Sequence, residues 1–149
     1  MVEFALVLPL LAVLLMGMLD FGRALNYWND VNQIAADGAR YAAVSENPGP
    51  TATPPTAGFA DWLAKQAETG ELYNGSESVV DKLQVCVSYP NGGTPKVGDP
   101  VKVVARAEYG LIPIVDEDGP TVVTLNGEAT MRLEVAPDPA SPLSGCSAP

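Results

Sequence analysis

Few residues of this chain have side chains that could do covalent or metal chemistry. The 149-residue sequence contains no histidine and only two cysteines. No serine or cysteine therefore has an imidazole base, no glycine-rich loop opens a helix to hold phosphate, and no two carboxylates are spaced as an acid–base pair in a cleft. The pattern argues against an enzyme, and we expect no catalytic residue and no cofactor.

The densest group of possible metal ligands is Asp116, Glu117 and Asp118, which stand directly before Gly119 and Pro120. Carboxylate oxygens are the ligands that calcium prefers, but the spacing does not match an EF-hand loop. A solvated turn between two strands is the simpler interpretation. The three acids remain a weak calcium candidate, and no other metal site is expected.

The two cysteines, Cys86 and Cys146, form an even pair. In an exported protein an even count favours a disulfide, which by the chain-entropy estimate would contribute about 4 kcal/mol for a loop of this length. It would also fix a C-terminal tail rich in proline, serine and alanine. The alternative is one buried thiol and one idle thiol on a disordered tail.

A lone carboxylate, Glu3, stands directly before a run of sixteen uncharged residues from Phe4 to Leu19. A charge inside a membrane costs about 2.5 to 3.5 kcal/mol at mid-bilayer, so Glu3 needs a partner, and another copy of the chain can supply one. The run spans about 24 Å as a helix, slightly less than a bilayer core of about 30 Å. No cation precedes Phe4, so we expect that a basic leader has been removed upstream.

Residues 3–44 accept a continuous helix of about 60 Å, with Pro9 as the one proline and a possible kink. Its second half is amphipathic and should lie against the rest of the chain or against neighbouring copies. We assign residues 1–25 to a membrane or filament-core helix and residues 20–44 to the amphipathic half of the same helix. The apolar positions of that half are Phe21, Ala24 or Leu25, Trp28, Val31, Ala35, Ala39 and Ala42.

The remainder predicts a small β-rich head over residues 59–149, after a loop rich in proline and threonine over residues 45–58. A short helix begins at Phe59 and is expected to be closed by Gly70. Asn74-Gly75-Ser76 matches a glycosylation acceptor, but a turn is the preferred interpretation.

Three runs of alternating residues then predict strands. The expected inward-facing residues are Leu83, Val85, Val87 and Tyr89; then Val101, Val103, Ala105, Ala107 and Tyr109; then Ala129, Met131, Leu133 and Val135. Asn91-Gly92-Gly93 suits a hairpin connection, and Asn126-Gly127 suggests a bulge after residues 121–125. Arg106 and Glu108 are expected to face Arg132 and Glu134 across adjacent antiparallel strands. The amphipathic half of the long helix should cover the inner face of this sheet.

The formal net charge is −10, of which −8 lies outside residues 1–44. A surface of this sign repels phosphate backbones, and no basic patch with interleaved aromatic residues occurs. Nucleic acid is therefore not an expected partner.

Three segments near the start carry a family resemblance: residues 2–10 (VEFALVLPL), 19–24 (LDFGRA) and 37–43 (DGARYAA). Together with residues 124–125 and 129–134, they resemble the TadE-like pilin and pseudopilin family of the type IV filament superfamily. The resemblance implies a precursor cut by a prepilin peptidase, with Glu3 at the position of the family's glutamate near the processed end. It further implies anchoring in the bacterial or archaeal inner membrane before assembly machinery adds the subunit to an extracellular pilus.

We therefore expect an α+β fold in which a long N-terminal helix packs by its second half on a small antiparallel sheet. The expected function is a structural pilus subunit, either major or minor, that polymerises with identical or related pilins and can serve adhesion. The residues expected to mediate assembly are Glu3, Phe4, Pro9, Phe21 and Trp28. The alternative is a single-pass membrane-anchored binding module that does not polymerise.

Overall fold

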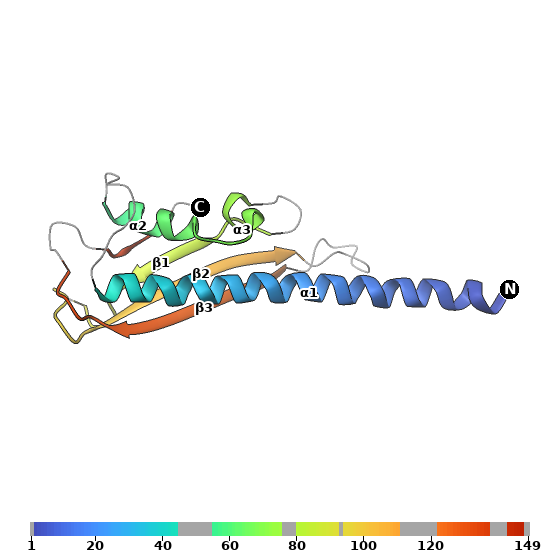
Figure 1. Cartoon of the computed structure of the whole chain (residues 1–149), viewed down its shortest axis with the longest axis horizontal. Helices are drawn as coiled ribbons and strands as arrows, with labels where there is room; N and C mark the ends of the chain where they lie inside the picture. The colour runs from blue at the N-terminus through green and yellow to red at the C-terminus, as the bar shows by residue number, and fades with distance from the viewer. Residues whose placement is uncertain are drawn as a thin grey trace.

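The computed structural model describes residues 2–44, 55–75, 80–92, 94–110, 122–137 and 143–147. A long helix extends well beyond a small α+β head (Figure 1). The helices are α1 (Val2–Ala43), α2 (Pro55–Ala64) and α3 (Gly70–Asn74), and the strands are β1 (Gln84–Ser88), β2 (Pro100–Gly110), β3 (Val122–Arg132) and β4 (Gly145–Cys146).

The predicted long helix is confirmed as α1, which contains 42 residues and is therefore about 63 Å long. It continues through Pro9 without a break. Leucine and alanine, both strong helix formers, dominate its sequence, and no second proline interrupts it. Its first half projects from the head, and its second half lies along the strands (Figure 1).

The sheet is antiparallel, with strand order β3-β2-β1-β4. The predicted alternation is confirmed in β2, where Val101, Val103, Ala105, Ala107 and Tyr109 are all buried. It is likewise confirmed in β1, whose Val85 and Val87 point inward. These side chains give the sheet one apolar face and leave the other face polar.

The pairing of β2 with β3 corrects two predictions. The register runs one to one from Pro100↔Arg132 to Gly110↔Val122, so there is no bulge at Asn126-Gly127. In this register Arg106 faces Asn126 and Glu108 faces Thr124, so the predicted charge pairs with Arg132 and Glu134 do not form across the ladder. The ion pair that joins the two strands is instead Lys102 with Glu128, at 2.8 Å.

Gly127 has a packing role in place of the expected bulge. A Cβ atom at this position would lie 2.5 Å from the backbone oxygen of Val31, far inside van der Waals contact. A glycine there lets the backbone of α1 approach β3 closely. The glycine signal in the sequence therefore marks a helix–sheet contact and not a break in the ladder.

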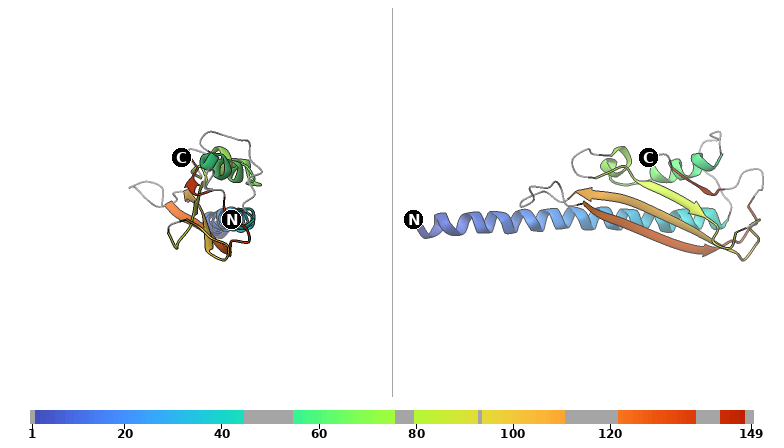
Figure 2. Two further views of the ribbon diagram at one scale, coloured as in Figure 1. Left: turned by 90° about the vertical axis from the view of Figure 1, so that its left-hand side faces the viewer. Right: turned by 180° about the vertical axis from the view of Figure 1, so that it is seen from behind.

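The second half of α1 covers the inner face of the sheet, as predicted, by packing on β2 and β3. Helix α2 covers the same face over β1 and β4, so both helices lie on one side of the sheet (Figure 2). The small residues Ala35, Gly38, Ala39 and Ala42 of α1 are buried by the head. They allow close packing of the kind that the sequence predicts, and here the partner is the head itself.

The head covers only part of the predicted apolar stripe and leaves the end nearest the uncharged run open. Phe21, Leu25 and Trp28 are 63%, 42% and 47% exposed. The positions that face the head there are Tyr27 and, unexpectedly, the acidic Asp20 and Asp30, which are all at least nine-tenths buried. Two buried carboxylates displace the stripe because the head supplies hydrogen-bond donors to them.

Val135 and the short helix also differ from the prediction. Val135 is 52% exposed because β3 ends at Arg132, three residues earlier. Helix α2 begins at Pro55, inside the predicted loop, and ends at Ala64. Gly70 does not close it, because Gly70 is the first residue of α3. The preferred turn at Asn74-Gly75 is supported by the positive φ of 73° at Gly75.

The predicted disulfide between Cys86 and Cys146 is present. It joins β1 to β4 at directly paired positions with a Cα–Cα distance of 4.0 Å. The amide of Val85 also donates to the Ser147 hydroxyl at 2.9 Å. The C-terminal segment is thus attached to the sheet, and neither cysteine is a free thiol.

Candidate functional site

The first half of α1 has no cover from the head. The large apolar side chains described between Phe4 and Leu19 are between 46% and 75% exposed. By length and composition α1 is a helix that could cross a membrane. Contiguous apolar surface of this extent is rare on monomeric soluble proteins and marks a site for lipid or for another protein.

One face of α1 carries a regular apolar stripe, which we call the heptad stripe. Its members recur at alternating spacings of three and four residues, the pattern that lets one helix pack along another. Each member is at least 42% exposed. The members are Phe4, Val7, Leu11, Leu14, Met18, Phe21, Leu25 and Trp28.

The heptad stripe extends past the end of the uncharged run. Trp28 lies nine residues beyond Leu19, or about 13 Å further along the helix axis. Around Trp28 the helix α1 already lies against the head, because the nearby side chains of Tyr27 and Asp30 are buried in the head. The head covers one side of the helix here and leaves the stripe on another.

The predicted assembly residues all lie on α1. Phe4, Phe21 and Trp28 belong to the heptad stripe, whereas Pro9 is exposed on a different face. Glu3 is part of the helix, but its side chain lies outside the described residues.

The weak calcium candidate, Asp116 to Asp118, also lies outside the described residues. Within the part of the chain that the structure describes, no three His, Cys, Asp or Glu side chains gather in a way that could hold a metal ion.

A pair of tyrosines joins α1 to the head where the free half of the helix begins. The hydroxyl of Tyr109 on β2 donates to the Asp20 carboxylate, and the hydroxyl of Tyr27 donates to Glu71 on α3. The two rings pack with centroids 5.5 Å apart. Burial, together with the adjacent Asp20 carboxylate, raises the pKa of Tyr109 well above its ordinary value of 10.0.

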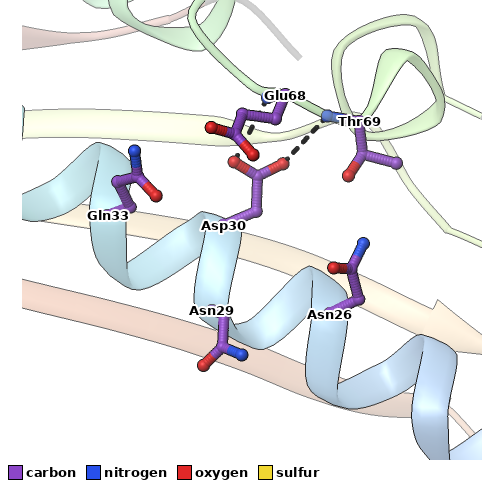
Figure 3. Close-up of a pocket in the computed structure, with 6 residues that line it drawn as sticks. All are labelled: Asn26, Asn29, Asp30, Gln33, Glu68 and Thr69. Atoms are coloured by element: carbon purple, nitrogen blue, oxygen red, sulfur yellow. Dashed lines mark hydrogen bonds between the residues drawn. The ribbon is translucent and has the colours of Figure 1, made fainter.

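Asp30 makes the second buried polar contact between α1 and the head. Its two carboxylate oxygens accept the backbone amides of Glu68 and Thr69, at 3.2 and 3.1 Å (Figure 3). A carboxylate accepting backbone N–H groups forms strong, charge-assisted hydrogen bonds. Asp30 therefore fixes the segment between α2 and α3 on the long helix.

These polar contacts were not among the predictions from the sequence. Asp20 and Asp30 both fall on the helix face that carries Tyr27, Val31 and Ile34, and an acid among apolar positions is a signal for a buried partner. The partners could not be identified from sequence, because Tyr109 is 89 residues from Asp20 along the chain.

Two hollows follow each other along the same side of α1. The one nearer the C-terminal end of the helix is called the upper hollow, and the one nearer the N-terminal end is called the lower hollow. The upper one, of about 240 Å³, is strongly polar and is lined by Asn26, Asn29, Asp30, Gln33, Glu68 and Thr69 (Figure 3). The lower one, of about 430 Å³, is lined by Met18, Leu19, Gly22, Arg23, Asn26, Tyr27 and Thr69. Asn26 and Thr69 line both, so the two hollows are contiguous.

The comparisons with known proteins agree with the resemblance at the N-terminus. A family model described as TadE-like protein matches residues 1–40, the segment that forms nearly all of α1. No curated protein and no solved structure matches the chain. The match thus covers the exposed half of the helix and its junction with the head, and does not extend to the strands.

Proposed function

We propose that this chain is a structural subunit of a Tad-type or related type IV pilus, which polymerises through α1 into an extracellular filament. The observation that carries the proposal is the heptad stripe, which lies on the TadE-like segment and stays exposed alongside the head. A helix with this periodicity packs well along another helix of the same periodicity. A second copy of the chain supplies such a helix.

The upper end of the stripe favours assembly over simple anchoring. A membrane anchor needs apolar surface only over the depth of the bilayer, which the uncharged run nearly spans. Leu25 and Trp28 lie about 9 and 13 Å beyond that run and next to the head, where lipid tails do not reach. Neighbouring subunits in a filament would cover them.

Glu3 has a specific role in this proposal. A subunit entering a helical array brings its Glu3 carboxylate near the free α-amine of a neighbour. At a separation of about 4 Å the attraction is about 4 kcal/mol in a partly solvated environment, before the cost of desolvation is subtracted. The pair would fix the axial register between subunits as well as adding to their affinity.

In the filament that we propose, neighbouring copies are shifted along the filament axis, so the heptad stripe of one α1 meets a different part of the next subunit and the contact is heterologous. Such a contact does not close on itself and therefore propagates into a filament. The partners in this proposal are identical or related pilins, a prepilin peptidase and the assembly machinery. The chain resides in the inner membrane first and then in the pilus, with the acidic head outside.

The deciding experiment compares Leu25→Gln with a matched control, Val97→Gln, in cells that express the pilus. Leu25 is 42% exposed on the heptad stripe, and Val97 is 64% exposed in the connection between β1 and β2. Neither substitution changes the uncharged run or buries a polar group. We expect Leu25→Gln to abolish sheared surface filaments while membrane insertion persists, and Val97→Gln to leave both unchanged.

A parallel variant, Glu3→Gln, tests the charge pair. The proposal predicts loss of filaments with normal insertion. A non-polymerising membrane anchor tolerates both Glu3→Gln and Leu25→Gln without any change in its surface display. Normal filament yield in both variants, measured by electron microscopy and mass spectrometry of the sheared fraction, would therefore contradict the proposal and favour the anchored binding module.

A further inference from the structure

The two contiguous hollows on α1 form one groove that changes polarity along the helix axis. We call it the Arg23 groove. Its lower end is apolar, with Met18 and Leu19 exposed on the wall and with Gly22, where an added Cβ would meet no atom within 4 Å. Its upper end has carboxamide and carboxylate side chains (Figure 3). Arg23 lines the lower hollow, three residues before Asn26, which lines both hollows.

The upper end of the groove is built from two elements. Asn26, Asn29 and Gln33 come from α1, whereas Glu68 and Thr69 come from the segment that Asp30 fixes on the helix. The hydrogen bonds that the Glu68 and Thr69 amides donate to Asp30 hold this segment in place, so the upper wall is positioned before any ligand arrives. The groove therefore has a fixed polar end and an open apolar end.

The position of Arg23 matches the boundary of a bilayer. Arg23 lies four residues past Leu19, where the uncharged run ends, and so about 6 Å further along the axis. The headgroup layer on each side of a membrane is about 5 to 8 Å deep, since a bilayer measures about 30 Å without headgroups and about 40 to 45 Å with them. With the run in the hydrocarbon core, Arg23 falls in the headgroup layer and the apolar wall in the acyl layer.

The charges along the groove are complementary to those of a zwitterionic headgroup, in which a negative phosphate is followed by a positive ammonium. Arg23, in the lower hollow, offers a guanidinium that can bind a phosphate in a bidentate manner. Asp30 and Glu68, at the upper end, offer carboxylates, and Asn26, Asn29 and Gln33 add carbonyl oxygens. Each Asp30 oxygen accepts one backbone amide and retains the capacity to accept another donor. The upper end therefore suits a group with several N–H donors and a positive charge.

We infer that the Arg23 groove binds a membrane phospholipid whose headgroup ends in a primary ammonium, such as phosphatidylethanolamine. The phosphate lies on Arg23, the ammonium among the amides and carboxylates above it, and an acyl chain along Met18, Leu19 and Gly22. A lipid with a net negative headgroup is disfavoured, because two carboxylates line the upper end and the chain as a whole carries a formal charge of −10. The inference rests on the membrane-anchored stage of the proposed function and does not require polymerisation.

Two substitutions test the groove without disturbing the head, and each has a matched control on the same helix. Arg23→Gln removes the phosphate ligand, and its control is Arg40→Gln, at an exposed arginine that pairs with Asp37 at 3.6 Å. Gly22→Leu fills the apolar end, where an added Cβ meets no atom within 4 Å. Its control is Gly17→Leu, which also meets no atom within 4 Å but lies outside the groove.

The experiment is native mass spectrometry of the full chain released from nanodiscs that contain equal amounts of phosphatidylethanolamine, phosphatidylglycerol and phosphatidylcholine. We expect one phosphatidylethanolamine molecule to stay bound to each wild-type chain. Arg23→Gln should lower this retention by about tenfold, the change that corresponds to the loss of one charge-assisted hydrogen bond. Gly22→Leu should lower it similarly, and the Arg40 and Gly17 controls should match the wild type.

Equal retention of the three lipids, a preference for phosphatidylglycerol, or unchanged retention in Arg23→Gln and Gly22→Leu would each overturn the inference. Glu68→Gln should reduce the preference for phosphatidylethanolamine over phosphatidylcholine, since a carboxylate that faces the ammonium is removed. Soluble phosphoethanolamine should not displace the lipid, because the apolar wall contributes to binding. The readout is lipid bound to single chains, so it is independent of whether the chain forms filaments.

Discussion

The hydroxyl of Tyr109, at the inner face of β2, donates a hydrogen bond to the carboxylate of Asp20 on α1. Asp20 directly follows Leu19, the last residue of the uncharged run, so this bond connects the head to the helix at the place where the exposed half begins. Both side chains are at least nine-tenths buried. The contact sets how the head is held relative to the segment that we propose to assemble.

Removing the hydrogen bond between Tyr109 and Asp20 should lower the stability of the head. Tyr109→Phe keeps the aromatic ring and removes the donor, which leaves the buried Asp20 carboxylate with one partner fewer. We expect the free energy of unfolding to fall by about 1 to 3 kcal/mol, the usual cost of a buried group losing its hydrogen bond. Chemical denaturation of the full chain in detergent measures this. The control Tyr41→Phe, at a ring that packs edge-on against Trp62, should have a smaller effect.

The same bond predicts a dependence on alkaline pH. Because burial and Asp20 raise the pKa of Tyr109 in the folded chain, the folded state holds the phenol proton more tightly than the unfolded state does. The resulting stabilisation is fully present below the unfolded pKa of about 10 and is lost as the pH rises through the folded pKa. The stability of the wild type should therefore decline above pH 10 more steeply than that of Tyr109→Phe. Parallel slopes in denaturation series at several pH values would show that Tyr109 does not contribute.

The disulfide should be a major source of stability in the head. Cys86 and Cys146 are 60 residues apart in sequence, so reduction frees a long loop in the unfolded state. We expect the double variant Cys86→Ser/Cys146→Ser to lose about 4 kcal/mol of unfolding free energy by the chain-entropy estimate. Wild-type protein under reducing conditions should match the double variant. A difference between these two samples would mean that the serines themselves disturb the packing of β1 on β4.

Close packing of α1 on β3 depends on Gly127. In Gly127→Ala the new methyl group would lie 2.5 Å from the backbone oxygen of Val31, and backbone atoms cannot rotate away as a side chain can. We expect a loss of about 1 to 3 kcal/mol, as for other overpacked positions. Gly70→Ala is the control, because a Cβ at Gly70 meets no atom within 4 Å. Equal stability of the two variants would show that α1 is not held tightly on the sheet.

Sequence periodicity was sufficient for the α1 helix and for the inner face of β2, because every residue there follows a simple spacing between apolar positions. It was insufficient for the face of α1 that meets the head. Phe21, Leu25 and Trp28 have the spacing of buried residues, yet they are exposed. A single chain cannot reveal from its periodicity whether an apolar stripe is covered by the same molecule or by a second one.

The long-range polar contacts also could not be predicted from the sequence. The register between β2 and β3 moved Arg106 and Glu108 away from their expected partners, because register depends on how the whole ladder and Gly127 fit against α1. The disulfide was predictable because only two cysteines exist and one pairing is available. Asp20, by contrast, had many possible donors, and only the fold selects Tyr109.

Asp30 provides the most local test of the junction between α1 and the head. Asp30→Ala removes both acceptors from the backbone amides of Glu68 and Thr69, whereas Asp30→Asn keeps one oxygen acceptor. Loss of a charge-assisted hydrogen bond costs about 1.5 to 3 kcal/mol, so local opening of this segment should become more frequent. Hydrogen exchange at the Glu68 and Thr69 amides should accelerate strongly in Asp30→Ala and less in Asp30→Asn.

The amide of Leu83, which donates to the Leu72 carbonyl at 2.9 Å, serves as an internal reference. If Leu83 exchanges faster to the same extent, the whole head has been destabilised; if only Glu68 and Thr69 respond, Asp30 holds this one segment, and with it the upper wall of the Arg23 groove.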